Sequence, residues 1–198
     1  MAPKPSPLYS IVAAVSAPIL YGLYRLNARG TENLPPEGGF VLAANHVSSF
    51  DPWPLGVPLW PRRFLRFMAK SELYWFPMSA VLNGGGAFPV RRGQSDAEAM
   101  ATAVSLARDG HVVAMFPEGT RQRKGLRKKF ESRPRTGAAR IAIDAGVPLV
   151  PAAIRGTDRL LRLGKLRVAY GAPLAPEGTP QELTERLMAE IDRLYETL

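Results

Sequence analysis

The chain has 198 residues, no cysteine and a formal net charge of +9 at pH 7. The absence of cysteine excludes a disulfide scaffold, a cysteine nucleophile and a thiolate metal site. A hydrophobic content of 46% and a mean hydropathy of −0.08 are typical of one globular domain and do not fit a protein with many membrane spans. The positive charge favours an anionic partner, which is a lipid headgroup, a phosphorylated substrate or nucleic acid.

The first predicted element is an uncharged, largely apolar stretch over residues 8–24, between Lys4 and Arg25. Tyrosines lie near both of its ends, where aromatic side chains often sit at a membrane interface. We therefore predict an N-terminal hydrophobic membrane-associating helix within residues 1–28, followed by one folded domain over residues 29–198. An interfacial or re-entrant helix fits the length best, and a membrane span or a helix packed on the soluble core are the alternatives.

Beyond residue 30, short apolar runs alternate with helical patterns. Strands are predicted over residues 39–44, 64–69, 87–90, 111–116, 149–154 and 166–170. Helices are predicted over residues 72–82, 95–108, 136–145 and 181–198, with a further short helix that begins at residue 51. This alternation predicts an α/β fold with a largely parallel central sheet flanked by helices. The loops at the carboxyl ends of such strands build the functional site.

The loop after the predicted strand 39–44 holds His46 and, five residues later, Asp51. An imidazole takes up a proton near physiological pH, and a carboxylate bound to one ring nitrogen leaves the other nitrogen facing a substrate. The spacing therefore predicts a general base, His46, oriented by Asp51; a plain helix cap is the alternative role for Asp51. Ser48 and Ser49 lie between them, but neither lies in the G-x-S-x-G turn of a serine nucleophile. We expect the substrate hydroxyl to attack directly.

Two further polar segments follow predicted strands. Arg92 comes after the strand 87–90, and residues 117–121 (Pro-Glu-Gly-Thr-Arg) come after the strand 111–116. A guanidinium binds phosphate through two parallel hydrogen bonds, so Arg92 and Arg121 are candidates for holding an acceptor phosphate.

These motifs together resemble the glycerolipid acyltransferase family, which acylates lysophosphatidic acid and related glycerol phosphates. The resemblance runs in order through residues 45–51, 86–92, 116–121 and 147–151. It implies a catalytic block that contains the histidine and aspartate described above. It also implies acceptor-binding residues, which are Glu118, Gly119, Thr120, Arg121 and, as a further basic phosphate contact, Arg135.

The implied reaction transfers a fatty acyl group from a thioester to the free hydroxyl of 1-acylglycerol 3-phosphate and gives phosphatidic acid. The donor is acyl-CoA or acyl-carrier protein and is a substrate, so no cofactor is expected. Other acceptors (glycerol 3-phosphate, another lysophospholipid or a glycolipid) are the enzymatic alternatives, and a non-catalytic lipid-binding protein is the alternative of a different class. No metal site is expected, because the two histidines lie far apart and no carboxylate cluster accompanies them.

A strongly basic segment completes the sequence pattern. Residues 121–135 hold eight basic side chains against the single acid Glu131. Beside a membrane, each such side chain contributes about 1 kcal/mol of attraction to acidic lipid. Phe130 is the one aromatic residue in this segment, so we expect no nucleic-acid partner. The expected partners are the lysophospholipid acceptor, the thioester donor and the membrane surface, at the cytoplasmic face of the cell membrane; the oligomeric state is left open.

Overall fold

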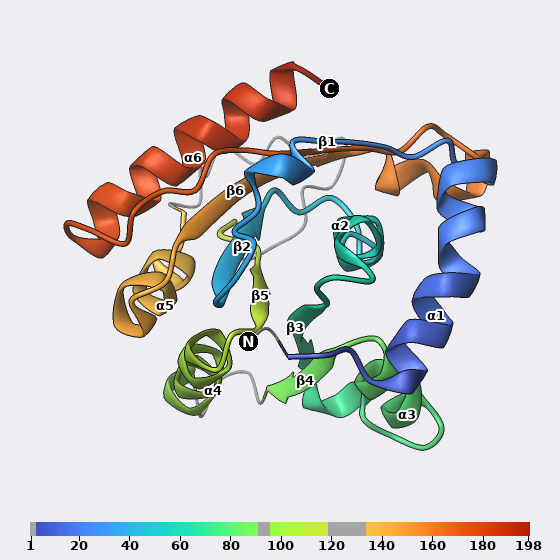
Figure 1. Cartoon of the computed structure of the whole chain (residues 1–198), viewed down its shortest axis with the longest axis horizontal. Coiled ribbons are helices and arrows are strands. Elements are labelled where there is room, and N and C mark those ends of the chain that lie inside the picture. The colour runs from blue at the N-terminus through green and yellow to red at the C-terminus, as the bar shows by residue number, and fades with distance from the viewer. Residues whose placement is uncertain (1–2, 91–95, 119–133) are drawn as a thin grey trace.

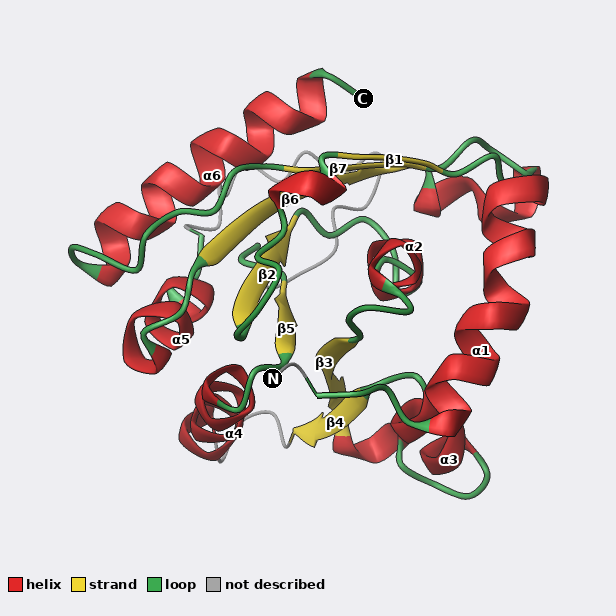
Figure 2. Ribbon diagram, in the orientation of Figure 1, coloured by secondary structure: helices red, strands yellow, loops and turns green. Residues whose placement is uncertain are grey.

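The computed structural model describes residues 3–90, 96–118 and 134–198. Within these residues seven strands form one sheet, in the order β1-β7-β6-β2-β5-β3-β4 (Figures 1 and 2). The strands are β1 (Asn27–Arg29), β2 (Phe40–Ala44), β3 (Leu65–Lys70), β4 (Ala87–Val90), β5 (Val112–Met115), β6 (Leu149–Arg155) and β7 (Arg167–Tyr170).

Every pair of neighbouring strands runs parallel except β6 with β7. The predicted α/β fold with a largely parallel sheet is therefore confirmed. β2 occupies the middle of the sheet, between β5 and β6, and all five of its residues are buried. A strand that is buried on both faces needs apolar side chains at every position, which explains its continuous Phe-Val-Leu-Ala-Ala run.

Helices cover both faces of the sheet (Figure 1). They are α1 (Pro7–Pro18), α2 (Pro52–Gly56), α3 (Met78–Gly84), α4 (Asp96–Arg108), α5 (Gly137–Ala145) and α6 (Pro180–Glu196). Alternate residues of β2 point to opposite faces. Phe40 and Leu42 pack in the core under α2 and the N-terminal segment, whereas Val41 and Ala43 pack in the core under α4, α5 and α6.

The N-terminal segment forms α1 and then a π-helical turn, Ile19–Leu23. Its inner side packs on the domain: Tyr9, Ala13 and Leu20 are buried, and the Tyr9 hydroxyl accepts a hydrogen bond from the Leu65 main-chain N–H at 3.3 Å. Its outer side exposes apolar side chains. In the described part of the chain, no helix combines the length and the apolar character needed to cross a membrane.

Two local predictions differ from the structure. The helix predicted over residues 72–82 is confirmed only from Met78 onward and is wrong before it, because Ser71–Leu73 is a 3₁₀ turn and α3 begins at Met78. Pro77 explains the shift, since proline has no N–H to donate and disfavours helical angles at the residue before it. The strand β1 was not predicted; among its three residues only Ala28 packs against the core, so it carries almost no periodic signal.

Candidate active site at the carboxyl ends of β2, β5 and β6

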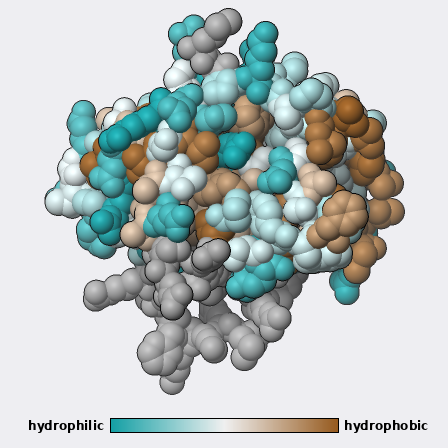
Figure 3. Space-filling model, turned by 90° about the horizontal axis from the view of Figure 1, so that it is seen from below, coloured by the Kyte–Doolittle hydropathy of each residue, from teal (hydrophilic) through white to brown (hydrophobic). Residues whose placement is uncertain are grey.

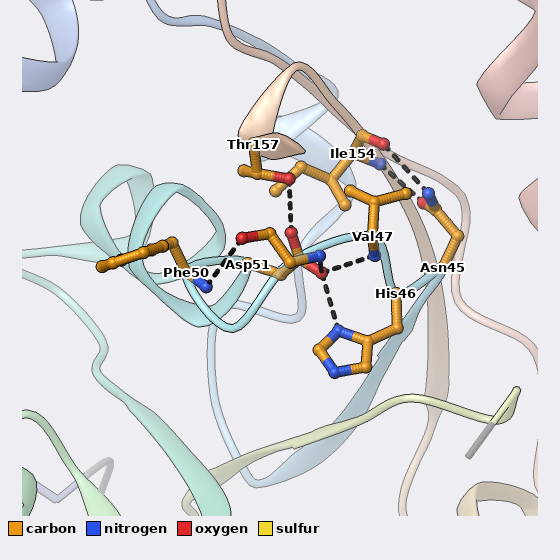
Figure 4. Close-up of polar contacts among 8 residues, drawn as sticks. Asn45, His46, Val47, Phe50, Asp51, Ile154 and Thr157 are labelled. Atoms are coloured by element: carbon orange, nitrogen blue, oxygen red, sulfur yellow. Dashed lines mark hydrogen bonds and ion pairs between the residues drawn. The ribbon is translucent and has the colours of Figure 1, made fainter. Parts of the chain in front are cut away.

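Asn45 fixes the point at which β2 ends. Its side-chain Nδ2 donates to the Ile154 carbonyl at 3.0 Å, and its Oδ1 accepts from the Ile154 N–H at 2.8 Å (Figure 4). The buried amide therefore continues the attachment of β2 to β6 beyond the last backbone pair. His46 follows directly, so its main chain starts from a fixed position at this edge of the sheet.

Asp51 holds His46 in one orientation. The Asp51 Oδ2 atom lies 2.7 Å from His46 Nδ1 and also accepts from the main-chain N–H groups of Val47 at 2.8 Å and Ser48 at 2.9 Å (Figure 4). Its Oδ1 accepts from the Thr157 hydroxyl at 2.5 Å. The Asp51 side chain is fully buried, and a buried carboxylate remains charged only when such donors surround it. It makes no capping hydrogen bond to α2, so the plain-cap alternative is wrong.

The contact with a carboxylate selects one histidine tautomer. An ionised carboxylate only accepts hydrogen bonds, so Nδ1 of His46 carries the proton and Nε2 carries the lone pair. The imidazole also stacks on the Phe116 ring, with centroids 4.2 Å apart and planes 21° apart. The side chain of His46 is 18% exposed. The ring is therefore fixed on two sides and still within reach of a substrate.

Glu118 lies against the same histidine, in the turn after β5. Burial raises the pKa of the Glu118 carboxyl above its ordinary value of 4.5. A hydrogen bond from the His46 main chain and the nearby imidazole oppose this rise, while Asp192 and Asp51 add to it through charge repulsion. A partly buried acid with a raised pKa next to a base is typical of functional sites.

The remaining predicted site residues fall into two groups. Arg135 is described: its main-chain N–H donates to the Pro117 carbonyl at 2.8 Å, which places its backbone beside the Glu118 turn, with an exposed side chain. The others lie outside the described residues, as does most of the basic segment 121–135; they are Arg92, Gly119, Thr120 and Arg121. Within the described ranges, no group of three or more His, Asp or Glu side chains is arranged to hold a metal ion.

Thr157 was not predicted, although it is a direct partner of Asp51. It begins the 3₁₀ turn Thr157–Arg162, directly after Gly156, whose φ is +100°. A side chain at Gly156 would collide with the main chain of Lys165, so glycine alone allows the tight turn that points Thr157 toward Asp51. The available signal was a Gly-Thr pair one residue after the predicted strand 149–154, at the same edge of the sheet.

Comparison with known proteins decides the family. The acyltransferase family model matches residues 25–155, which is more than half of the chain. The chain belongs to the acyltransferase family. A 1-acyl-sn-glycerol-3-phosphate acyltransferase of Bacillus subtilis (strain 168) is 36% identical to it over 149 residues, which cover 72% of this chain and 70% of that protein.

Two other relatives extend the comparison. The chloroplastic 1-acyl-sn-glycerol-3-phosphate acyltransferase BAT2 of Brassica napus is 30% identical over 149 residues, but the match spans only 41% of that protein. The crystal structure of the 1-acyl-sn-glycerophosphate acyltransferase PlsC from Thermotoga maritima superposes with a TM-score of 0.68, over 94% of this acyltransferase and 78% of that chain. At 24% identity, this likeness shows the shared fold.

The Thr157 hydroxyl is expected to support turnover by holding Asp51. In Thr157→Val the shape of the side chain is kept but one charge-assisted hydrogen bond is lost, which corresponds to about 1.5–3 kcal/mol. We expect kcat for acyl transfer to fall about tenfold or more at nearly constant KM, and Thr157→Ser to retain activity. Thr184→Val removes another buried hydroxyl, on α6, and is the matched control. Equal kcat values for the Thr157→Val and Thr184→Val variants would contradict this role.

Glu118 is expected to lower stability at neutral pH. Because its folded-state pKa is raised, the folded protein binds this proton more tightly than the unfolded chain does, so stability falls as pH rises from the unfolded pKa through the folded pKa. Glu118→Gln removes that titration and should raise the free energy of unfolding at neutral pH, with the gain vanishing at acid pH. Urea titrations at several pH values measure it, with the exposed Glu177→Gln as the control. A gain that did not change with pH would refute the assignment.

Proposed function

We propose that this acyltransferase moves a fatty acyl group from an acyl thioester to the free hydroxyl of 1-acylglycerol 3-phosphate and so forms phosphatidic acid. The observation that carries the proposal is the His46 imidazole, bound through Nδ1 to the buried Asp51 and partly exposed at the edge of the sheet. The Bacillus subtilis relative, a 1-acyl-sn-glycerol-3-phosphate acyltransferase at 36% identity, supports this acceptor.

The chemistry needs one base and no covalent enzyme intermediate. Nε2 of His46 removes the proton from the acceptor hydroxyl as that oxygen attacks the thioester carbonyl carbon. Asp51 stabilises the imidazolium that forms. When the tetrahedral intermediate collapses, the carbon–sulfur bond breaks, and the imidazolium returns the proton to the leaving thiolate. The products are the new ester and a free thiol, and the histidine is again neutral.

The acceptor binds next to this base. We propose that Glu118 contacts the glycerol part of the acceptor, because its carboxyl lies against His46. Arg135, beside the same turn, contributes a cation for the acceptor phosphate, and we assign the same task to Arg92 and Arg121. Gly119 and Thr120 complete the acceptor loop.

The donor is acyl-CoA or acyl-carrier protein, and both present the same thioester to His46. The thioester is already activated, so base, position and charge stabilisation are sufficient for transfer. No cofactor takes part in this scheme. Since both donors are soluble and the acceptor is a lipid, we propose that the protein works on the cytoplasmic face of the cell membrane.

The attachment to that membrane is proposed to use one apolar surface, which we call the apolar face. It consists of the exposed side of α1, the first residue of the π-helical turn that follows, and the neighbouring 71–81 segment. Its exposed side chains are Leu8, Ile11, Val12, Val15, Ile19, Leu73, Trp75, Phe76 and Val81. Helices α1 and α3 are in contact, which places the two parts of this surface next to each other. Figure 3 shows hydrophobic side chains gathered on the side of the molecule where α1 lies. Phe76 is 87% exposed, so its ring contributes little to the packing of the domain. A group of exposed apolar side chains of this kind marks a surface that binds a membrane or a partner.

Replacing His46 is expected to abolish transfer. General-base catalysis contributes about 10²–10⁴-fold, so His46→Ala should lose at least that factor in kcat with its fold intact. Asp51→Asn should also reduce turnover severely. His111→Asn replaces the other histidine of the chain and should retain activity. A panel of acceptors, with lysophosphatidic acid, glycerol 3-phosphate and other lysophospholipids, measures the preference; a loss of only a few-fold in His46→Ala, or no transfer to lysophosphatidic acid, would contradict the proposal.

The apolar face is expected to bind neutral bilayers. A fully buried aliphatic side chain contributes about 1.5–3 kcal/mol, so Ile11→Gln with Val15→Gln should weaken partition into phosphatidylcholine vesicles by tenfold or more. Glutamine keeps the helix, because its helix propensity is high. Ala101→Gln with Ala189→Gln, on exposed sides of α4 and α6, is the control. Co-sedimentation measures the partition, and an equal effect of both pairs would place the attachment elsewhere.

A further inference from the structure

A basic cavity lies at the outer part of the sheet, away from His46. Its volume is about 270 Å³, and four cationic side chains line it together with Asn27, Thr197 and Leu198: Arg25, Arg29, Lys165 and Arg167. A water molecule occupies about 30 Å³ in the liquid, so the cavity has room for a phosphate group with several waters. The cations come from two chain segments, one that leads into and through β1 and one at the start of β7.

The strand register brings these cations together. Arg167 in β7 lies opposite Asn27 in β1 on one side and opposite Arg155 in β6 on the other. Like charges directly opposite one another on neighbouring strands are destabilising. The Arg155 guanidinium has other partners that stabilise its charge: it donates to the Leu198 carbonyl oxygen at 3.0 Å and lies over the Tyr195 ring.

The four cavity cations have no such compensation. Among the described residues, no carboxylate lies within ion-pair distance of any of them. The Arg29 Nε donates to the Asn27 side chain at 2.9 Å, which orients its guanidinium and leaves the terminal nitrogens available. A bound anion would relieve the mutual repulsion of these side chains, and a guanidinium pair matches the oxygens of a phosphate.

Backbone strain marks the same place. Within the described ranges, the non-glycine residues with positive φ are Arg25 (48°), which lines the cavity, and Leu163 (49°), two residues before the lining residue Lys165. Side chains other than glycine adopt this region at a cost in energy. Hydrogen bonds hold the two segments side by side, from Asn27 N–H to the Leu166 carbonyl at 3.0 Å and from Leu166 N–H to the Tyr24 carbonyl at 3.1 Å.

Exposed apolar side chains also lie close in the chain to the cavity residue Lys165. Leu161 and Leu163, between β6 and β7, are both exposed, and their segment lies beside the end of α1 in Figure 1. Cations that border an apolar surface are placed as the headgroup region of a bilayer requires, with apolar side chains in the lipid and charges at the level of the phosphates.

We propose that this cavity binds the phosphate group of an anionic phospholipid headgroup at the bilayer surface. It is distinct from the acceptor phosphate, which is proposed to lie beside Glu118. The carboxyl end of β6, which carries Thr157, and the amino ends of β7 and β1 share one edge of the sheet. A headgroup bound there would therefore turn the edge that carries His46 toward the membrane. The proposal rests on attachment through the apolar face and not on acyl transfer.

The test compares two double variants of equal net charge. Arg29→Gln with Arg167→Gln removes two cavity cations, whereas Arg140→Gln with Arg186→Gln removes two exposed arginines on α5 and α6. Co-sedimentation is measured with phosphatidylcholine vesicles and with vesicles that hold one phosphatidylglycerol for every four phosphatidylcholine molecules. The cavity variant should bind the anionic vesicles about fivefold more weakly for each arginine removed, with unchanged binding to neutral vesicles. The control variant should lose much less.

Other outcomes separate the explanations. Equal losses in both double variants would show that net charge alone attracts the protein, and would overturn the cavity proposal. Loss of binding to neutral vesicles would show a damaged apolar face instead of a headgroup site, and would also overturn it. Inorganic phosphate, followed by phosphorus NMR without vesicles, tests the other source of the anion. If the cavity variant loses phosphate binding but binds anionic vesicles as well as the unaltered protein does, the cavity is a site for soluble phosphate. That result would reject a lipid headgroup.

Discussion

The buried charge of Asp51 is the constraint on which the site depends. Moving a carboxylate out of water costs several kcal/mol, and the carboxylate remains ionised only if donors replace the lost hydration. Here the donors are the His46 imidazole, the main-chain N–H groups of Val47 and Ser48, and the Thr157 hydroxyl. They come from two loops that are more than a hundred residues apart in the chain. Both loops must be in place before the charge can be buried, so the orientation of His46 is tied to the folding of the whole sheet.

The sheet meets this requirement by placing β2 next to β6. Asn45 binds the Ile154 main chain, and two residues beyond Ile154 the glycine turn presents Thr157 to Asp51. On the other side, β5 delivers Phe116 against the imidazole ring and Glu118 against the His46 main chain. Three adjacent strands therefore each contribute one element of the site, and substitutions in the buried strand ends would disturb it without touching a substrate.

The sequence predicted which strands contribute to the site better than it predicted individual contacts. Apolar runs bounded by glycine, proline and polar residues located six strands, and a histidine directly after one of them indicated the site. The pairing of Thr157 with Asp51 depends on which strand lies beside β2, and periodicity within one strand contains no such information. β1 escaped prediction for a related reason: its position is set by backbone pairing with β7 and by one inward side chain. The first half of the helix predicted over residues 72–82 failed because Pro77 outweighs the apolar pattern around it. The parts of the predicted site at Arg92 and residues 119–121 stay predictions.

The fold shows where part of the positive charge of the chain is concentrated. Composition alone left lipid, phosphorylated substrate and nucleic acid open as partners. The described cations at β1 and β7 border exposed leucines and the end of α1, and the apolar face continues from there to α3. Burial of an apolar surface attracts a protein to any bilayer, whereas a phosphate-binding cavity at its border selects anionic lipid and sets which edge of the protein faces the bilayer. An enzyme whose acceptor is a lipid needs that orientation to be set, because His46 can reach the acceptor hydroxyl only when its edge of the sheet meets the bilayer surface.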